Sequence, residues 1–288
     1  MHLNKKIDRV FPRKTTMTPD DDMVFFGPPP VLILPEIDEV HVSVAFTYDR
    51  GKAEELAEDW SVLGVPVKIG GPAYDDPADG PFIPGRYVKK GAVFTSRGCN
   101  NKCWFCGAWK REGKLRELPI QDGWNILDNN LLQCSEGHVR AVFDMLKRQK
   151  HKPVFTGGLE AKMLQPWHCD LLRDSKAKRM YFAYDTPDDY DPLVQAGQML
   201  MDAGISPRSH IMSCYNLIGY HGDTFEEAEK RMMQTIQAGF MPYAMLYRDT
   251  NGAVDKEWHK FQREWLRPAL VSHKFGEYWR EIHEGQEK

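Results

Sequence analysis

Three cysteines, Cys99, Cys103 and Cys106, lie within a span of eight residues at the spacing C-x3-C-x2-C. A short loop that carries three thiols can direct three thiolates at one soft metal centre. Structural zinc sites and electron-carrying iron–sulfur clusters normally use four protein ligands. Three ligands therefore predict a centre that keeps one position for an outside ligand. The spacing alone leaves one alternative open, a zinc site completed by a distant His or Cys.

The aromatic Phe105 directly precedes the last cysteine, and with it the spacing resembles the cluster loop of the radical S-adenosylmethionine enzymes. The resemblance implies that Cys99, Cys103 and Cys106 hold a 4Fe–4S cluster and that S-adenosylmethionine binds its fourth iron. An electron from a flavodoxin- or ferredoxin-like donor would then cleave this cofactor to a 5′-deoxyadenosyl radical that acts on a substrate. Phe105 would contact the adenine.

Polar residues follow several of the predicted strands. Asp128, Asn129 and Asn130 come after a strand predicted at 124–127. They resemble the acidic-acidic-Asn signature that binds the amino group of S-adenosylmethionine in the cobalamin-type branch of the family. An ammonium needs acceptors, and a carboxylate with side-chain amides supplies them. An ordinary Asn-rich turn is the alternative.

Two later segments match the family in the same way. Asp185 follows a strand predicted at 180–184, where family members place a side chain that holds the ribose hydroxyls. Gly219 begins the segment Gly-Tyr-His-Gly-Asp-Thr, which resembles the turn that lies along the adenine. Thr224 and Glu227 also form a capping box, so a simple helix cap is the alternative for the end of this segment.

Two residues are candidates for substrate contact. Glu160 follows the strand predicted at 153–156, and Tyr247 stands near the end of the strand predicted at 240–248. Both are expected at the edge of the sheet that carries the cysteine loop. A plain loop carboxylate is an equally good interpretation of Glu160.

Strands are predicted near residues 92, 124, 153, 180, 211 and 240, and helices alternate with them. Such alternation predicts an α/β fold with parallel strands. With the resemblance it implies a partial (β/α)6 radical S-adenosylmethionine barrel over residues 91–250, with the site at the carboxyl ends of the strands. Residues 251–288 are expected to form a helical C-terminal extension.

The chain before the cysteines divides into two parts. Residues 1–30 show no period and are expected to be irregular and partly extended. Residues 31–90 contain a strand at 40–46, a helix at 49–64, a strand at 65–69 and a Pro/Gly-rich linker. This unit resembles a truncated cobalamin-binding Rossmann-like domain. It lacks the Asp-x-His-x-x-Gly loop of such domains, so cobalamin is not expected to bind.

The composition sets further bounds. The chain has 288 residues, 27% of them charged, and a net charge of −3, so no overall positive field indicates nucleic acid as a partner. No segment predicts a membrane span. The remaining cysteines, Cys134, Cys169 and Cys214, are scattered, which favours a reducing, cytoplasmic location. The alternatives to a radical enzyme of unknown substrate are a cobalamin-dependent radical methyltransferase and a non-catalytic iron–sulfur or zinc module.

Overall fold

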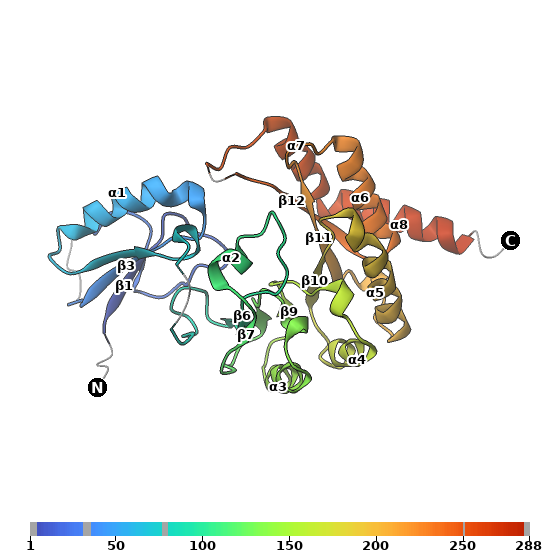
Figure 1. The fold of residues 1–288 in the computed structure, drawn as a ribbon, viewed down its shortest axis with the longest axis horizontal. Coiled ribbons are helices and arrows are strands. Elements are labelled where there is room, and N and C mark those ends of the chain that lie inside the picture. The colour runs from blue at the N-terminus through green and yellow to red at the C-terminus, as the bar shows by residue number, and fades with distance from the viewer. Residues whose placement is uncertain (1–4, 31–35, 77–79, 250, 285–288) are drawn as a thin grey trace.

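The computed structural model describes residues 5–30, 36–76, 80–249 and 251–284, which are organised on two parallel β-sheets (Figure 1). The smaller sheet has the order β2-β1-β3-β4. Its strands are β1 Ile7–Val10, β2 Val24–Phe25, β3 Glu39–Ser43 and β4 Val67–Gly70. The chain is therefore an α/β protein with parallel sheets, as the alternating pattern predicts.

The smaller sheet has one covering helix, α1 Arg50–Ser61, which connects β3 to β4. Val40 and Val42 of β3 pack with Leu56 and Trp60 of α1 in a buried core. The predicted strand-helix-strand unit is thus confirmed. The expectation that residues 1–30 are irregular is wrong for β1, which pairs with both β2 and β3. This strand carries charged residues in place of an apolar alternation, which hides it in the sequence.

The larger sheet has six parallel strands in the sequential order β5-β8-β9-β10-β11-β12, and no closed barrel is formed by the described residues. All six strands lie where the sequence predicts them. They are β5 Ala92–Val93, β8 Asn125–Ile126, β9 Val154–Phe155, β10 Arg179–Ala183, β11 Met212–Ile218 and β12 Met241–Leu246. A separate antiparallel pair joins β6 Ser96–Arg97 to β7 Arg116–Glu117.

Helices connect the strands from β8 to β12 and pack on the outer face of the sheet (Figure 1). They are α3 Glu136–Lys147, α4 Pro166–Asp174, α5 Tyr190–Asp202 and α6 Phe225–Gln237. The Ser135 hydroxyl accepts from the backbone N–H of His138, and the Thr224 hydroxyl accepts from that of Glu227. The cap predicted at Thr224 is therefore confirmed, and Ser135 caps α3 in the same way.

The C-terminal extension is helical as expected, with α7 Lys256–Trp265 and α8 Pro268–Glu284. Trp265, Val271 and Phe275 are buried against Ile218 of β11 and Met232 of α6. The extension therefore covers the outer face at the β12 end of the sheet. Among the described residues no helix has the length and apolar character needed to cross a membrane.

The small unit contacts both ends of the six-stranded sheet. The loop after β12 reaches back toward α1 in Figure 1. The guanidinium of Arg248 lies 5.2 Å from the centre of the Tyr48 ring, and a Cβ on Gly252 would come within 2.3 Å of Tyr48. At the other end, the Asn125 amide of β8 lies 3.8 Å from the sulfur of Met17. The small unit therefore stands beside the opening between β5 and β12.

Candidate functional site

The cysteines lie on a loop whose base is fixed by strand pairing. Ser96 and Arg97 of β6 pair with Glu117 and Arg116 of β7, so the loop leaves and returns at one place. Gly98 has φ +81°, and a Cβ on it would come within 2.2 Å of the Lys114 carbonyl oxygen. Only glycine fits this close approach. A short helix, α2 Ala108–Glu112, completes the loop and lies between the small unit and the large sheet (Figure 1).

Cys99, Cys103 and Cys106 are all half-buried free thiols. Burial raises the pKa of Cys99 and of Cys103, and the neighbouring thiols of the loop act in the same direction. The three groups are thus near enough to influence one another. In the described parts of the chain, no three His, Cys, Asp or Glu side chains are grouped closely enough to hold a metal ion as they stand.

Asp128 does not face the loop opening. Its Oδ1 accepts from the backbone N–H of Thr95 at 2.6 Å, and its Oδ2 accepts from the hydroxyls of Thr95 and Ser96 at 2.5 and 2.7 Å. The residue is only 1% exposed, and burial raises its pKa. In this structure Asp128 therefore fixes the strand that leads into the cysteine loop, and the expectation that it accepts from a bound ammonium is corrected.

Asn129 and Asn130 act on the loop in different ways. The Asn129 Oδ1 accepts from the backbone N–H of Gly98 at 3.0 Å, next to the first cysteine. Asn130 donates from Nδ2 to the Glu160 Oε2 at 2.6 Å, while its own Oδ1 is buried without a hydrogen-bond partner among the residues that the structure describes. The Asn130 side chain also lies close enough to the Cys99 thiol to lower its pKa by hydrogen bonding. Asn130 thus connects the first cysteine to Glu160.

Glu160 is the carboxylate that the structure places beside Cys99. Gln133 donates from Nε2 to the Glu160 Oε2 at 2.9 Å and to the Asn101 Oδ1 at 3.1 Å. The Gln133 Oε1 accepts from the backbone N–H of Asn100 at 2.9 Å. Gln133 has no motif around it, so sequence reasoning missed it. Its side chain links the loop to Glu160 and holds the carboxylate in place.

Asp185 and Gly219 lie near the carboxyl ends of β10 and β11. Burial raises the pKa of Asp185 to about 7, although the backbone N–H of Leu217 donates to its Oδ1 at 3.0 Å. Gly219 has φ +70°, and a Cβ on it would approach the Leu246 Cδ1 to 2.7 Å. Its backbone N–H donates to the Asp223 Oδ2 at 2.8 Å. The expected turn is therefore closed by the side chain of Asp223.

An aromatic cluster joins the cysteine loop to the last two strands. The Trp104 ring lies 5.3 Å from the ring of Phe105, 5.6 Å from that of Tyr220 and 5.9 Å from that of Tyr247. Trp104 is still 55% exposed. Tyr247 is thus brought to the loop, as the strand-end argument predicts. Trp104 was not a predicted site residue, and its position between two cysteines was the available signal.

The candidate site therefore unites the cysteine loop with residues from the carboxyl ends of β8, β9, β11 and β12, while Asp185 follows β10 at the same edge. Polar side chains gather next to Cys99 and aromatic side chains around Trp104. No protein-family model matches this chain, and no curated protein matches it either.

Proposed function

We propose that this chain is a radical S-adenosylmethionine enzyme with a partial (β/α)6 barrel. The observation that carries the proposal is the position of the three-cysteine loop at the carboxyl edge of a sequential six-stranded parallel sheet, with Glu160 held beside Cys99. Ligands of parallel α/β sheets bind at this edge. A zinc or iron–sulfur module that only stabilises a fold would need neither the oriented carboxylate nor the fixed turn at Gly219.

The donor set fits a 4Fe–4S cluster with an outside ligand. Cys99, Cys103 and Cys106 supply three soft thiolate ligands. When bound, the cluster supplies the electron that cleaves S-adenosylmethionine to a 5′-deoxyadenosyl radical. Asn129 and Asp128 fix the loop at its base, because they bind the backbone on either side of Arg97. Trp104 and Phe105 exclude water on one side of the loop.

Glu160 and Asn130 have the chemistry to bind the amino group of S-adenosylmethionine. The second oxygen of Glu160 and the buried Oδ1 of Asn130 are both acceptors without a partner among the described residues. A bound ammonium would satisfy them. Asp185 is assigned to the ribose hydroxyls, since only its Oδ1 accepts from the backbone. Gly219 and Phe105 are assigned to the adenine, and the substrate itself is unassigned.

The alternative of a cobalamin-dependent methyltransferase has less support. His41 is the histidine of the smaller sheet, and both of its ring nitrogens have partners, the Glu39 carboxylate and the Tyr87 hydroxyl. It is therefore not free to coordinate cobalt. We propose that cobalamin does not bind to this unit.

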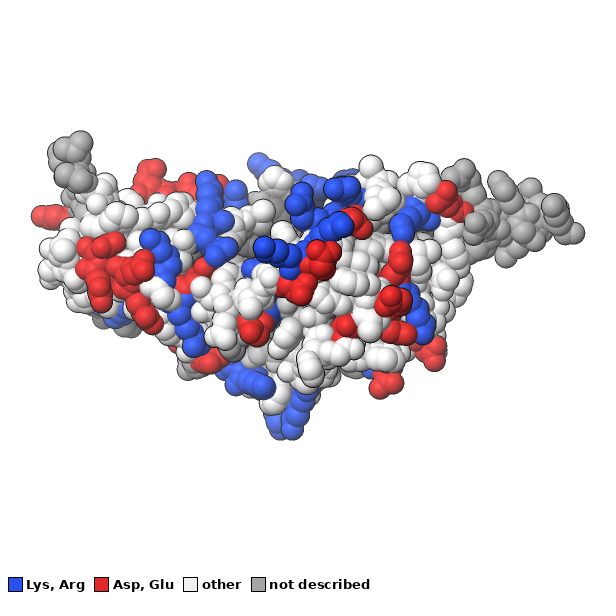
Figure 2. Space-filling view, turned by 90° about the horizontal axis from the view of Figure 1, so that it is seen from above, with Lys and Arg blue, Asp and Glu red and all other residues white. Residues whose placement is uncertain are grey.

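The proposal requires an external one-electron donor. Figure 2 shows that Lys and Arg side chains gather in the middle of the face seen from above, while Asp and Glu side chains lie at one end, beside this basic group and toward the other end. Lys102, Lys110 and Lys114 of the cysteine loop and α2 are exposed, and none of them forms an ion pair with an acidic side chain among the described residues. This charge would complement an acidic flavodoxin- or ferredoxin-like protein.

Metal analysis after anaerobic reconstitution tests the proposal. We expect about four irons and four sulfides per chain in the parent protein. Cys99→Ala, Cys103→Ala and Cys106→Ala should each lose the cluster. Cys134→Ser, which changes another half-buried thiol, should retain it. Stoichiometric zinc in place of iron, in protein purified without oxygen, would refute the proposal.

A further inference from the structure

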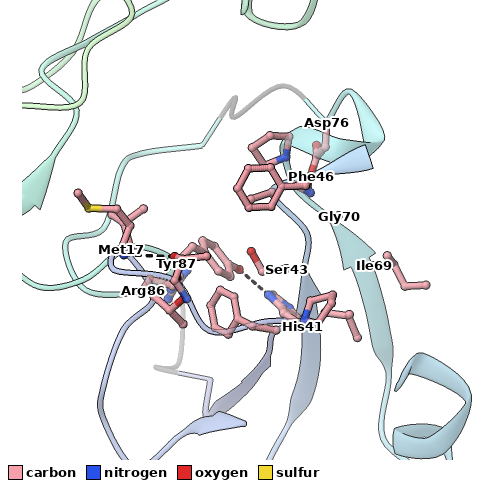
Figure 3. Close-up of a pocket in the computed structure, with 18 of the residues that line it drawn as sticks. Met17, His41, Ser43, Phe46, Ile69, Gly70, Asp76, Arg86 and Tyr87 are labelled. Atoms are coloured by element: carbon pink, nitrogen blue, oxygen red, sulfur yellow. Dashed lines mark hydrogen bonds between the residues drawn. The ribbon is translucent and has the colours of Figure 1, made fainter. Parts of the chain in front are cut away.

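A cavity of about 750 Å³ lies at the smaller sheet, on the side away from α1 (Figure 3). A doubly wound sheet carries helices on both faces. Here, residues 82–88 of the linker cover the second face, and the Tyr87 ring stacks on His41 with centroids 6.0 Å apart. The linker fills less space than a helix layer would. The cavity remains between the linker, the carboxyl ends of β3 and β4, and the segment that leads to Cys99.

The walls of the cavity are largely apolar and include several aromatic rings. Phe46 lies at the end of β3, Phe82 in the linker and Phe94 directly after β5. Phe82 and Phe94 meet edge to face at 5.5 Å. Met17 and Ser43 also line the cavity (Figure 3). Such walls suit a flat apolar body, which offers contact area to rings on more than one side.

Three hydrogen-bonded side chains, Glu39, His41 and Tyr87, lie at one side of the cavity. The Glu39 Oε2 lies 2.9 Å from the His41 Nε2, and His41 Nδ1 is hydrogen-bonded to the Tyr87 hydroxyl. Lys5 and Lys68 hold Glu39 in its ionised form and lower its pKa strongly by hydrogen bonding. With Glu39 ionised and the imidazole neutral, the His41 Nε2 donates to Glu39 and its Nδ1 accepts from the Tyr87 hydroxyl. These hydrogen bonds hold the Tyr87 ring against His41 at the wall of the cavity.

Positive charge at the cavity is only partly neutralised. The Arg97 guanidinium lies 4.1 Å from the centre of the Phe94 ring and shares the Oε1 of Glu112 with Arg111, at 3.2 and 3.1 Å. Arg86 forms no ion pair with an acidic side chain among the described residues. Burial raises the pKa of the neighbouring Tyr87, and the positive charge of Arg86 opposes this shift.

The other charged lining groups contribute little net charge. Arg13 is bound by Asp49 through two hydrogen bonds, and Lys68 is bound by Glu39. Asp76, the remaining carboxylate of the lining, is exposed, and its Oδ2 lies 3.3 Å from the backbone nitrogen of Gly71. Arg86 is therefore the cation of the lining that has no acidic partner among the described residues, and an anion is favoured beside it.

We propose that this cavity binds a planar apolar molecule that carries an anionic group. Its body lies against the Phe46, Phe82 and Phe94 rings, and its anionic group binds Arg86. The cavity volume lies within the usual range for small-molecule sites, about 300–1,000 Å³. Binding at this cavity requires neither the cluster nor S-adenosylmethionine, so its test is independent of the proposed function.

Two matched fluorescent probes test this inference on the full chain. 8-Anilino-1-naphthalenesulfonate has a flat apolar body and a sulfonate, and N-phenyl-1-naphthylamine has the same body without the charge. We expect saturable binding of the sulfonate at one site per chain. The neutral probe should bind about tenfold more weakly, because a charge-assisted hydrogen bond is absent.

Three variants locate the site. Arg86→Gln should weaken binding of the sulfonate about tenfold and leave binding of the neutral probe unchanged. Lys90→Gln makes the same charge change in the same linker, away from this cavity, and should alter neither probe. Ser43→Phe places a further ring in the cavity and should weaken binding of both probes.

The inference is wrong if the sulfonate does not bind, if both probes bind equally well, or if Arg86→Gln and Lys90→Gln have the same effect. If Ser43→Phe fails to fold, the comparison of Arg86→Gln with Lys90→Gln still shows whether the anionic group binds at this cavity.

Discussion

Both carboxylate oxygens of Asp128 accept hydrogen bonds from Thr95, Oδ1 from its backbone N–H and Oδ2 from its hydroxyl. Thr95 is fully buried and stands four residues before the first cysteine of the loop. The side chain that follows β8 therefore fixes the chain that follows β5. This contact makes Asp128 a positioning residue for the cysteine loop.

Asp128→Ala should destabilise the protein because the buried N–H of Thr95 loses its acceptor. A buried donor left unpaired costs about 1–3 kcal/mol of unfolding free energy. Urea denaturation measures the change. The exposed Asp144→Ala should stay within about 0.5 kcal/mol of the parent protein. Equal stability of the Asp128 variant and the parent would show that the contact does not fix the loop.

Glu160→Gln should weaken binding of S-adenosylmethionine and leave the iron content unchanged. The amide can still accept from Asn130 and Gln133, but it no longer carries the charge that attracts an ammonium. Loss of a charge-assisted hydrogen bond predicts an affinity about tenfold to a hundredfold lower. Equilibrium dialysis with the reconstituted protein measures it, and the exposed Glu136→Gln is the control. Unchanged affinity would remove Glu160 from the cofactor site.

Asp223 and Arg231 form a buried ion pair at the turn after Gly219, with an Oδ2–Nη2 distance of 2.8 Å and side-chain exposures of 0% and 7%. Asp223→Ala leaves the guanidinium buried and unpaired, which should cost about 3–5 kcal/mol of unfolding free energy. The double variant with Arg231→Met should recover much of this loss. Denaturant unfolding of the single and double variants checks it. A double variant no more stable than the single one would contradict this explanation.

Asp8→Val should stabilise the protein. Both oxygens of Asp8 are buried without a hydrogen-bond partner among the described residues, and burial raises its pKa. The folded state then binds the proton more tightly than the unfolded state. The contribution of Asp8 to the unfolding free energy therefore falls as the pH rises from about 3.9 through the raised pKa.

The increase in unfolding free energy from Asp8→Val should accordingly be larger at pH 8 than at pH 4. Thermal unfolding at the two values measures this difference, with the exposed Asp38→Asn as the control for a general charge effect. An equal gain at both pH values would mean that Asp8 titrates normally in the folded state.

Local patterns in the sequence predict most of the helices and strands. The cap at Ser135, the cap at Thr224 and the apolar runs of β10 and β11 predict their elements because these signals act between near neighbours. β1 escaped prediction because its middle residues are Asp8 and Arg9. Its place in the sheet depends on pairing with β3, about thirty residues away.

The site was predicted less completely, for the same reason. The sequence places Asp128 and Glu160 after neighbouring strands, so both are expected at one edge of the sheet. Which of them is buried depends on hydroxyls that stand 32 and 33 residues before Asp128. Which of them contacts the loop depends on Gln133, whose partners Asn101 and Glu160 lie 32 and 27 residues away in the sequence. The spacing of the motifs predicts neither the burial of Asp128 nor the contact of Glu160 with the loop.

The most direct test of the proposed function is release of 5′-deoxyadenosine by the reconstituted protein with dithionite and S-adenosylmethionine. We expect slow release by the parent protein, and much less by Asp185→Asn and Glu160→Gln at equal iron content. Cys134→Ser should match the parent. A parent protein that carries its cluster and binds S-adenosylmethionine, yet releases no 5′-deoxyadenosine under strong reduction, would contradict the proposed function.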